Sequence, residues 1–194
     1  MGVCWASNYV SQEMQFGSQF FQWYYWSNHW SRRFEYPWAV ITSQMVKGMK
    51  VLDAGGGSSC LTQYLKQRMG PENVINVDID PTYADLVADI ENLYPHFSDD
   101  YFDRVLCISV LEHCNRPFHA LGSLRNALKL GGRLCLTFDV VEGSAIDLDA
   151  AKHICKFLGE ELPPQPEGIL IGHLETESGE DTIVRVLCID HVKS

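Results

Sequence analysis

Residues 51–59 of the chain read Val51-Leu52-Asp53-Ala54-Gly55-Gly56-Gly57-Ser58-Ser59. The apolar start is typical of a buried strand, and the three glycines let a ligand approach the backbone where a Cβ would block it. A helical pattern begins at Ser59, so the first N–H groups of that helix point toward the same ligand. The stretch therefore predicts a strand, a ligand-binding loop and a helix in direct succession.

Short apolar runs alternate with helical patterns after Lys50, which is typical of a parallel sheet with helices on both faces. The last two runs are joined around Ser178-Gly179 and indicate an antiparallel hairpin. We expect an α/β fold with a doubly wound, Rossmann-like seven-stranded sheet that is mostly parallel and has an antiparallel C-terminal hairpin. Strands are predicted at 51–53, 74–77, 86–88, 104–109, 133–138, 168–174 and 182–190, and helices at 59–69, 117–129 and 147–158.

The N-terminal part differs in composition from the rest. Of the 22 aromatic residues (5 Trp, 8 Tyr and 9 Phe), 11 lie between Phe16 and Trp38. Pro37 predicts a helix break at the residue before it, with a second helix over 38–47. We divide the chain into an aromatic N-terminal helical cap, 1–47, which either packs on the main domain or forms a substrate-binding lid, and a main domain, 48–194. The aromatic residues that share one helical face are Phe16, Phe20, Trp23, Trp30 and Phe34.

Charge and hydropathy exclude several classes of protein. The 15 basic and 25 acidic residues give a net charge of -10, which disfavours binding to a nucleic-acid backbone. No apolar run approaches the roughly 18 residues of a membrane span, and the start lacks the pattern of a signal peptide, so we expect a cytoplasmic protein. The seven cysteines form no C-x-x-C pair and predict no zinc ribbon. The sequence leaves the oligomeric state open.

A nicotinamide-binding loop is the first alternative that the glycine run raises. Its G-x-G-x-x-G pattern, started at Gly55, requires glycine at position 60, where the chain has Cys60. The D-x-G-x-G pattern of Asp53, Gly55 and Gly57 instead resembles motif I of class I S-adenosylmethionine-dependent methyltransferases, of the small-molecule, type 11-like kind. The resemblance covers roughly residues 50–140 and includes Ser109-Val110-Leu111-Glu112-His113 and Leu130-Gly131-Gly132.

The resemblance implies S-adenosyl-L-methionine as the cofactor and assigns its contacts. An acidic residue at the end of the second strand, here Asp78, holds the ribose hydroxyls, and an aspartate after the third, here Asp89, accepts from the adenine amino group. These two are 11 residues apart, so the usual helix between the strands must shrink to about one turn near 82–85. The cofactor-binding residues expected from the resemblance are Asp53, Gly55, Gly56, Gly57, Asp78, Ile79, Asp89, Ile90 and Ser109.

Methyl transfer to oxygen needs alignment, exclusion of water and a base for the hydroxyl proton. The candidate catalytic residues are His113, just past the fourth strand, and Asp139, at the end of the fifth, with Glu142 nearby. His113 has an alternative role in bonding to the backbone or to the neighbouring carboxylate. Ser109 stands where metal-dependent catechol-type members carry an aspartate, so we expect no metal site.

The aromatic segment supplies the candidate substrate contacts Arg33, Tyr36 and Trp38, and Arg32 or Arg33 is a candidate partner for the carboxylate of the cofactor. We expect methyl transfer at oxygen to a small-molecule or glycan-type acceptor, with no nucleic-acid partner and no membrane span. The alternative is a catalytically inactive S-adenosylmethionine-binding partner subunit, because every residue that the resemblance identifies serves cofactor binding.

Overall fold

The computed structural model describes residues 2–6, 31–165, 171–175 and 181–194. Most of the expected aromatic helix, Phe16 to Phe34, lies outside these residues. The helices are α2 (Arg32–Thr42), α3 (Cys60–Met69), α4 (Pro117–Ala127), α5 (Leu148–Phe157) and the 3-10 turns η3 (Pro71–Asn73), η4 (Ile90–Asn92) and η5 (Leu111–His113). The strands are β1 (Val3–Trp5), β2 (Val51–Ala54), β3 (Val74–Asp78), β4 (Leu86–Val87), β5 (Phe102–Ile108), β6 (Leu128–Val141), β7 (Ile171–Glu175) and β8 (Asp181–Val192).

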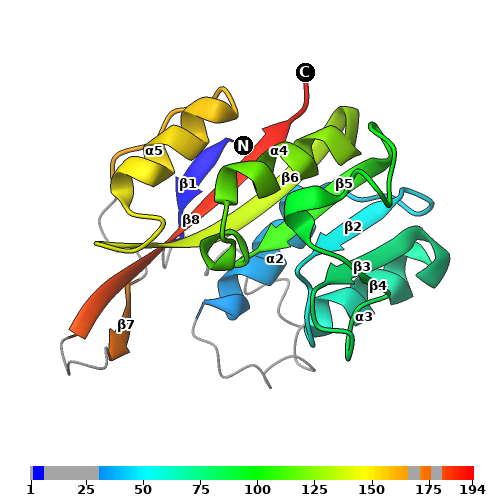
Figure 1. The fold of residues 1–194 in the computed structure, drawn as a ribbon, viewed down its shortest axis with the longest axis horizontal. Helices are drawn as coiled ribbons and strands as arrows, with labels where there is room; N and C mark the ends of the chain where they lie inside the picture. The colour runs from blue at the N-terminus through cyan, green and yellow to red at the C-terminus, as the bar shows by residue number, and fades with distance from the viewer. Residues whose placement is uncertain (1, 7–30, 166–170, 176–180) are drawn as a thin grey trace.

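The strands form one twisted sheet, shown in Figure 1, in the order β1-β8-β6-β5-β2-β3-β4, with β7 also pairing with β8. Strands β6, β5, β2, β3 and β4 are parallel, whereas β8 runs antiparallel to β6 and to β7. These pairings confirm the doubly wound, mostly parallel fold and its antiparallel C-terminal hairpin. The order places the carboxyl ends of five neighbouring parallel strands along one edge of the sheet, which is where ligands bind in open α/β sheets.

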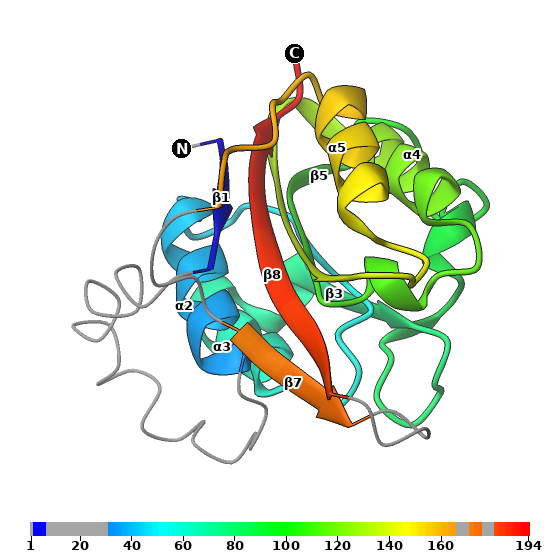
Figure 2. The same ribbon diagram turned by 90° about the vertical axis from the view of Figure 1, so that its left-hand side faces the viewer.

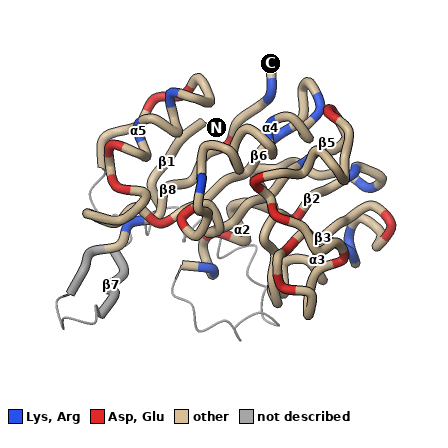
Figure 3. The backbone as a smooth tube through the Cα atoms, viewed as in Figure 1, with Lys and Arg blue, Asp and Glu red and all other residues tan. Residues whose placement is uncertain are grey.

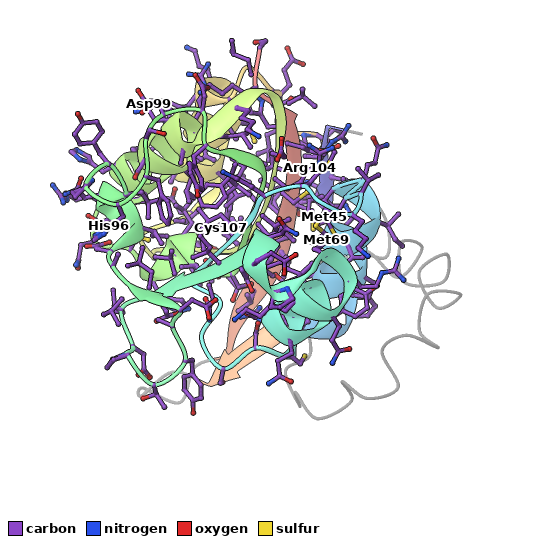
Figure 4. All side chains as sticks on the ribbon, turned by 90° about the vertical axis from the view of Figure 1, so that its right-hand side faces the viewer. Met45, Met69, His96, Asp99, Arg104 and Cys107 are labelled. Atoms are coloured by element: carbon purple, nitrogen blue, oxygen red, sulfur yellow. The ribbon has the colours of Figure 1, made fainter. Side chains whose placement is uncertain are left out.

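Helices cover both faces of the sheet, with α2 and α3 on one face and α4 and α5 on the other (Figure 2). Successive side chains of a strand point to opposite faces, so each face has its own core. In β5, Val105 and Cys107 join the core under α4 and α5, and their neighbours Leu106 and Ile108 join the core under α2 and α3. Figure 4 shows Cys107 in the interior, with Met45 and Met69 together beside α2 and α3.

The first strand of the sheet comes from a part of the chain that we expected to be helical. Strand β1 pairs antiparallel with β8 from Val3 opposite Ile189 to Trp5 opposite Leu187. It meets the half of β8 that β7 leaves open, because β7 pairs further back, at residues 181–185. Trp5 is buried, and its indole Nε1 donates to Pro163 O over 3.0 Å. Pairing partners about 185 residues apart explain why local sequence patterns did not predict this strand.

The predicted helix break at Pro37 is wrong. Helix α2 runs through the proline from Arg32 to Thr42 instead of beginning at residue 38. A proline in a helix removes one N–H donor and disfavours the preceding turn, but packing can outweigh that cost. Phe34, Tyr36 and Trp38 are all buried against the sheet, and this buried surface keeps the helix intact.

The connection from β3 to β4 is short, and β6 follows α4 without an intervening loop. The chain between β3 and β4 is a turn at 81–83, which confirms the shortened connection. Strand β6 begins at Leu128, directly after α4, and not at the expected residue 133. Its pairing with β5 shifts between Phe102 and Arg104, and a Cβ at Gly132 would lie 2.7 Å from Lys129 O. Gly131 has φ +72, so both positions of the pair favour glycine inside this irregular start of the strand.

Candidate cofactor and active site

The glycine loop after β2 is packed so closely that side chains cannot replace its glycines. Gly55 has φ +72, and a Cβ there would lie 2.5 Å from Val110 Cγ1. A Cβ at Gly56 would lie 2.5 Å from Asn76 Oδ1 and 2.7 Å from Asp53 Oδ2. The loop is thus held between the ends of β3 and β5. Because its residues have no side chains, a ligand can approach the backbone of Gly55 and Gly57, which are half-buried.

Asp53 lies under this loop and not at its surface. Its buried Oδ2 accepts from Thr62 Oγ1 over 2.6 Å, which ties the end of β2 to the first turn of α3. Burial raises the pKa of the Asp53 carboxyl to about 6, and the Thr62 hydrogen bond opposes that effect. Asp53 therefore holds the loop and the helix in register, and any contact with a cofactor would be indirect.

Asp78 is placed at the end of β3, beside the last glycine of the loop. Its Oδ2 accepts from Gly57 N over 2.8 Å, and its Oδ1 accepts from Asp80 N over 2.9 Å. A carboxylate has about four lone-pair sites, so these two backbone donors orient the group and leave acceptor capacity for a diol. The next side chain, Ile79, is 75% exposed and offers apolar surface beside this carboxylate. This carboxylate and apolar surface fit a ribose and the base attached to it.

Asn76, two residues before Asp78, is a part of the site that the sequence motifs missed. Its Oδ1 accepts from Gly56 N over 3.1 Å, and its Nδ2 donates to Gly57 O over 3.2 Å and to Tyr83 O over 3.1 Å. A single buried amide thus joins the glycine loop to the turn after β3. Its position in the sequence could have identified it, because Asn76 and Asp78 are residues i and i+2 of one strand and therefore share one face.

Asp89 and Ile90 lie just beyond β4. The Asp89 side chain is exposed and its Oδ1 accepts from Glu91 N over 2.8 Å, so it caps the short turn η4. Ile90 is buried, and the next residue, Glu91, accepts from Arg116 N over 2.9 Å and from Arg116 Nε over 2.7 Å. The Glu91–Arg116 pair thus joins η4 to the start of α4.

A buried polar network occupies the ends of β5 and β6. Ser109 follows β5 and has φ +50. Its hydroxyl and that of Thr137 in β6 both donate to Oε1 of Glu35, each at a distance of 2.5 Å. Oε2 of Glu35 accepts from Arg32 over 2.6 Å. The hydroxyl of Ser109, which we expected to bind the cofactor, is therefore used within the protein. Glu35 was not among the residues identified from the sequence, because its partners lie far along the chain.

Two further carboxyl groups, Glu112 in η5 and Asp139 in β6, lie at this edge. Glu112 Oε1 accepts from Asp139 N over 3.1 Å. Glu112 Oε2 and Asp139 Oδ1 are buried and accept no hydrogen bond from the described residues. Burial raises the pKa of Glu112 to about 8, and burial together with the charge of Glu35 raises the pKa of Asp139 to about 6. Near pH 7 Glu112 is thus mostly protonated and Asp139 mostly ionised.

The remaining predicted site residues are spread over different environments. His113 is exposed at the end of η5. Trp38 is 2% exposed and packs in the core under α2. Tyr36 is buried, and that burial raises the pKa of its phenol to about 12. The side chain of Arg33 lies outside the described part of the chain. The structure thus brings Asp139 to the cofactor edge, and it does not bring His113 or Trp38 into the same cluster.

The described residues contain neither a metal-binding cluster nor a membrane-spanning helix. No group of three or more His, Cys, Asp or Glu side chains among them is arranged to hold a metal ion. Across the same residues, no helix has the length and apolar character that crossing a bilayer requires.

The chain is similar in sequence to known methyltransferases. A family model described as a methyltransferase domain matches residues 52–136. The chain is 31% identical over 131 residues to the tRNA U34 carboxymethyltransferase of Dichelobacter nodosus, covering 60% of this chain and 41% of that protein. It is 33% identical over 103 residues to the ubiquinone/menaquinone biosynthesis C-methyltransferase of Bordetella avium, covering 45% and 40%. The chain therefore spans about two fifths of the length of these curated relatives.

A solved structure supports the fold over nearly the whole chain. The S-adenosylmethionine-dependent methyltransferase from Aquifex aeolicus superposes with a TM-score of 0.54 at 15% identity, covering 94% of this chain and 98% of that one. The residues that match the family model include the glycine loop, Asp78 and Asp89. The cofactor of this domain is S-adenosyl-L-methionine. Residues 52–136 thus match a methyltransferase domain, and the fold of the chain is that of a solved S-adenosylmethionine-dependent methyltransferase.

Proposed function

We propose that the protein transfers the methyl group of S-adenosylmethionine to a hydroxyl oxygen of a small-molecule or glycan-type acceptor, with Asp139 as the general base. The observation that carries the proposal is Oδ1 of Asp139 at the carboxyl edge, which is buried and accepts no hydrogen bond from the described residues, in a group with a pKa of about 6. An efficient base has a pKa near the working pH and an oxygen free to accept a proton. Asp139 combines both properties, whereas His113 is exposed.

The order of the strands supports the placement of the cofactor along this edge. In our proposal Asp89 and Ile90 contact the adenine, Asp78 and Ile79 the ribose, and the loop Gly55–Gly57 the middle of the cofactor. Strands β4, β3, β2, β5 and β6 follow one another across the sheet, so the methionine end then reaches β5 and β6. There it lies near Asp139, as transfer to an adjacent acceptor requires.

The residues of this chain have defined tasks in the transfer. When bound, S-adenosylmethionine supplies an electrophilic methyl group on a sulfonium, whose charge disappears as the S–CH₃ bond breaks. Asp139 takes the hydroxyl proton of the acceptor, and the acceptor oxygen forms the new bond to carbon. Glu112, protonated near pH 7, places no second negative charge beside Asp139 and leaves that residue as the base.

A small acceptor, and not RNA, is favoured by charge. One relative is named for its action on tRNA, but this chain has 25 acidic and 15 basic residues. In Figure 3 the Lys and Arg positions lie singly or in short runs along the chain, with Asp and Glu positions between them. A net negative charge disfavours a protein that must neutralise several phosphates. We further propose that residues 1–47 cover the methionine end of the cofactor and form one wall of the acceptor pocket, and that 48–194 form the domain that binds the rest of the cofactor.

The test is an acceptor screen with purified protein, in which methylated products are identified by mass spectrometry. Asp139→Asn should lower kcat by about 10²- to 10⁴-fold, the usual contribution of a general base. Asp99→Asn, in the exposed turn before β5 at the opposite edge, is the matched control and should keep full activity (Figure 4). Methylation at nitrogen or carbon, or full activity of Asp139→Asn, would refute the proposal.

The screen also addresses the alternative of an inactive partner subunit. Such a subunit would bind S-adenosylhomocysteine tightly by calorimetry and yet methylate no acceptor until a second protein is added. NAD, measured in the same way, should not bind, because Cys60 stands where its glycine fingerprint requires a glycine.

A further inference from the structure

Glu35 is a fully buried carboxyl group whose partners come from three separate parts of the chain. Its exposed fraction is 0%, and it accepts hydrogen bonds from Arg32 one turn earlier, Ser109 after β5 and Thr137 of β6. The last two lie 74 and 102 residues away. A buried carboxylate is costly unless it is paired and hydrogen-bonded, and this one satisfies both conditions. The start of α2 is therefore attached firmly to the carboxyl ends of two central strands.

This attachment continues to the glycine loop. Thr137 accepts from Ser109 N with both its backbone oxygen (2.9 Å) and its Oγ1 (3.1 Å), so its hydroxyl proton is free to go to Glu35. Ser109 is held with φ +50, and the next residue, Val110, fills the space beside Gly55. Glu35 thus fixes α2 relative to the place where the middle of the cofactor lies.

Arg32 is the cation of this network, and its hydrogen bonds to the described residues use one of its three side-chain nitrogens, Nη1. Its Nη1 contacts Glu35 Oε2 and, over 3.2 Å, Ser31 Oγ. The side chain is 16% exposed, and none of its nitrogens is buried without a partner. A guanidinium has five N–H donors in a planar fork, so binding at one nitrogen orients the group and leaves other donors accessible. Arg32 is therefore a fixed, partly open cation at the β5–β6 end of the site.

We propose that Glu35 is a positioning residue that holds Arg32 as the anchor for the α-carboxylate at the methionine end of the cofactor. The adenosine end is provided for by acidic residues after β3 and β4, and those positions suit hydroxyl and amino donors but not a carboxylate. Arg32 lies at the opposite end of the edge and offers the fork geometry that a carboxylate matches. The inference concerns the cofactor and does not depend on which acceptor is methylated or on the role of Asp139.

The experiment compares two ligands that differ at this end. S-adenosylhomocysteine carries the α-carboxylate, and 5′-methylthioadenosine lacks the whole amino-acid part. Arg32→Ala should weaken S-adenosylhomocysteine binding by about 10- to 100-fold, as expected for losing a charge-assisted pair, and change 5′-methylthioadenosine binding by less than about twofold. Arg68→Ala, an exposed arginine on α3, is the matched control and should leave both dissociation constants unchanged.

The positioning role of Glu35 has its own readout. Glu35→Gln keeps the shape but removes the charge that holds Arg32, so it should weaken S-adenosylhomocysteine by about 3- to 10-fold and leave 5′-methylthioadenosine unchanged. Added to Arg32→Ala, it should weaken S-adenosylhomocysteine no further, because the two residues act as one unit. A purely structural role of Glu35 predicts instead that both ligands weaken equally and that the losses in the double variant add.

Either of those outcomes would overturn the proposal, as would unchanged affinity of Arg32→Ala for S-adenosylhomocysteine. Circular dichroism and thermal melting establish that each variant folds. If Glu35→Gln does not fold, Ser109→Ala removes one donor to Glu35 and should give the same ligand pattern at smaller size. The α-carboxamide of S-adenosylhomocysteine gives a second test, since the wild type should bind it more weakly than the acid and Arg32→Ala should not distinguish the two.

Discussion

The backbone N–H of Asp139 donates to Oε1 of Glu112 over 3.1 Å, and this contact joins the end of β6 to the turn that follows β5. The two carboxyl groups are close enough for the charge of Asp139 to add to the effect of burial in raising the pKa of Glu112. Protonation at this edge is therefore linked to the stability of the fold.

Glu112→Gln should change how stability depends on pH. Burial raises the pKa of Glu112 from 4.5 to about 8, so its protonated form stabilises the fold below pH 4.5, and that contribution is lost as pH rises toward 8. Glutamine cannot ionise, and the variant should lose about 2 to 4 kcal/mol less free energy of unfolding than the wild type between pH 5 and 8.5, given about 1.4 kcal/mol per pKa unit. Urea unfolding at both pH values measures the difference. Glu161→Gln, at an exposed position, should retain the wild-type slope.

Asp78→Ala should weaken binding of S-adenosylhomocysteine. Its carboxylate is oriented by Gly57 N and Asp80 N, and the loss of a hydrogen bond to a charged acceptor costs about 1.5 to 3 kcal/mol. Isothermal titration calorimetry on the folded variant measures this loss. The exposed neighbour Asp80 provides the comparison, and an equal loss in Asp80→Ala would contradict the ribose assignment.

Gly56→Ala should lower both stability and cofactor affinity. The added methyl group would lie 2.5 Å from Asn76 Oδ1 and 2.7 Å from Asp53 Oδ2, and such overpacking costs about 1 to 3 kcal/mol. Gly122→Ala, inside helix α4, is the matched control, because a Cβ there would meet no atom of the described residues within 4 Å. The control should be neutral or more stable by about 0.5 to 1 kcal/mol in thermal or urea unfolding. Equal effects of the two substitutions would mean that the loop is not packed as described.

Methyl transfer should not require added metal. The residue after β5 is Ser109, its hydroxyl is bound to Glu35, and the described residues contain no cluster with the ligands a cation needs. Activity should therefore persist after dialysis against EDTA. Loss of activity that magnesium restores would show that a metal site exists elsewhere in the chain.

The sequence alone determined the parts of this protein that depend on neighbouring residues. The strand, glycine loop and helix of residues 51–69 follow from apolar periodicity and from the conformations open to glycine, and the short turn after Asp78 follows from residue spacing. The fold class follows from the same alternation of strands and helices. Asp78 was predicted as a ribose contact from the resemblance to the methyltransferase family, and its place at the end of a parallel strand agrees with where open α/β sheets bind ligands.

Tertiary structure decided what depends on distant partners. Strand β1 exists because residues 3–5 find β8 at the other end of the chain, and α2 continues through Pro37 because its aromatic face is buried. Local sequence propensity predicts neither the pairing of β1 nor the continuation of α2. Glu35 reads in sequence as one acidic residue in an aromatic segment, and its role depends on hydroxyls 74 and 102 residues away. The raised pKa values of Glu112 and Asp139 likewise arise from burial, which the packed fold creates and which no stretch of sequence specifies by itself.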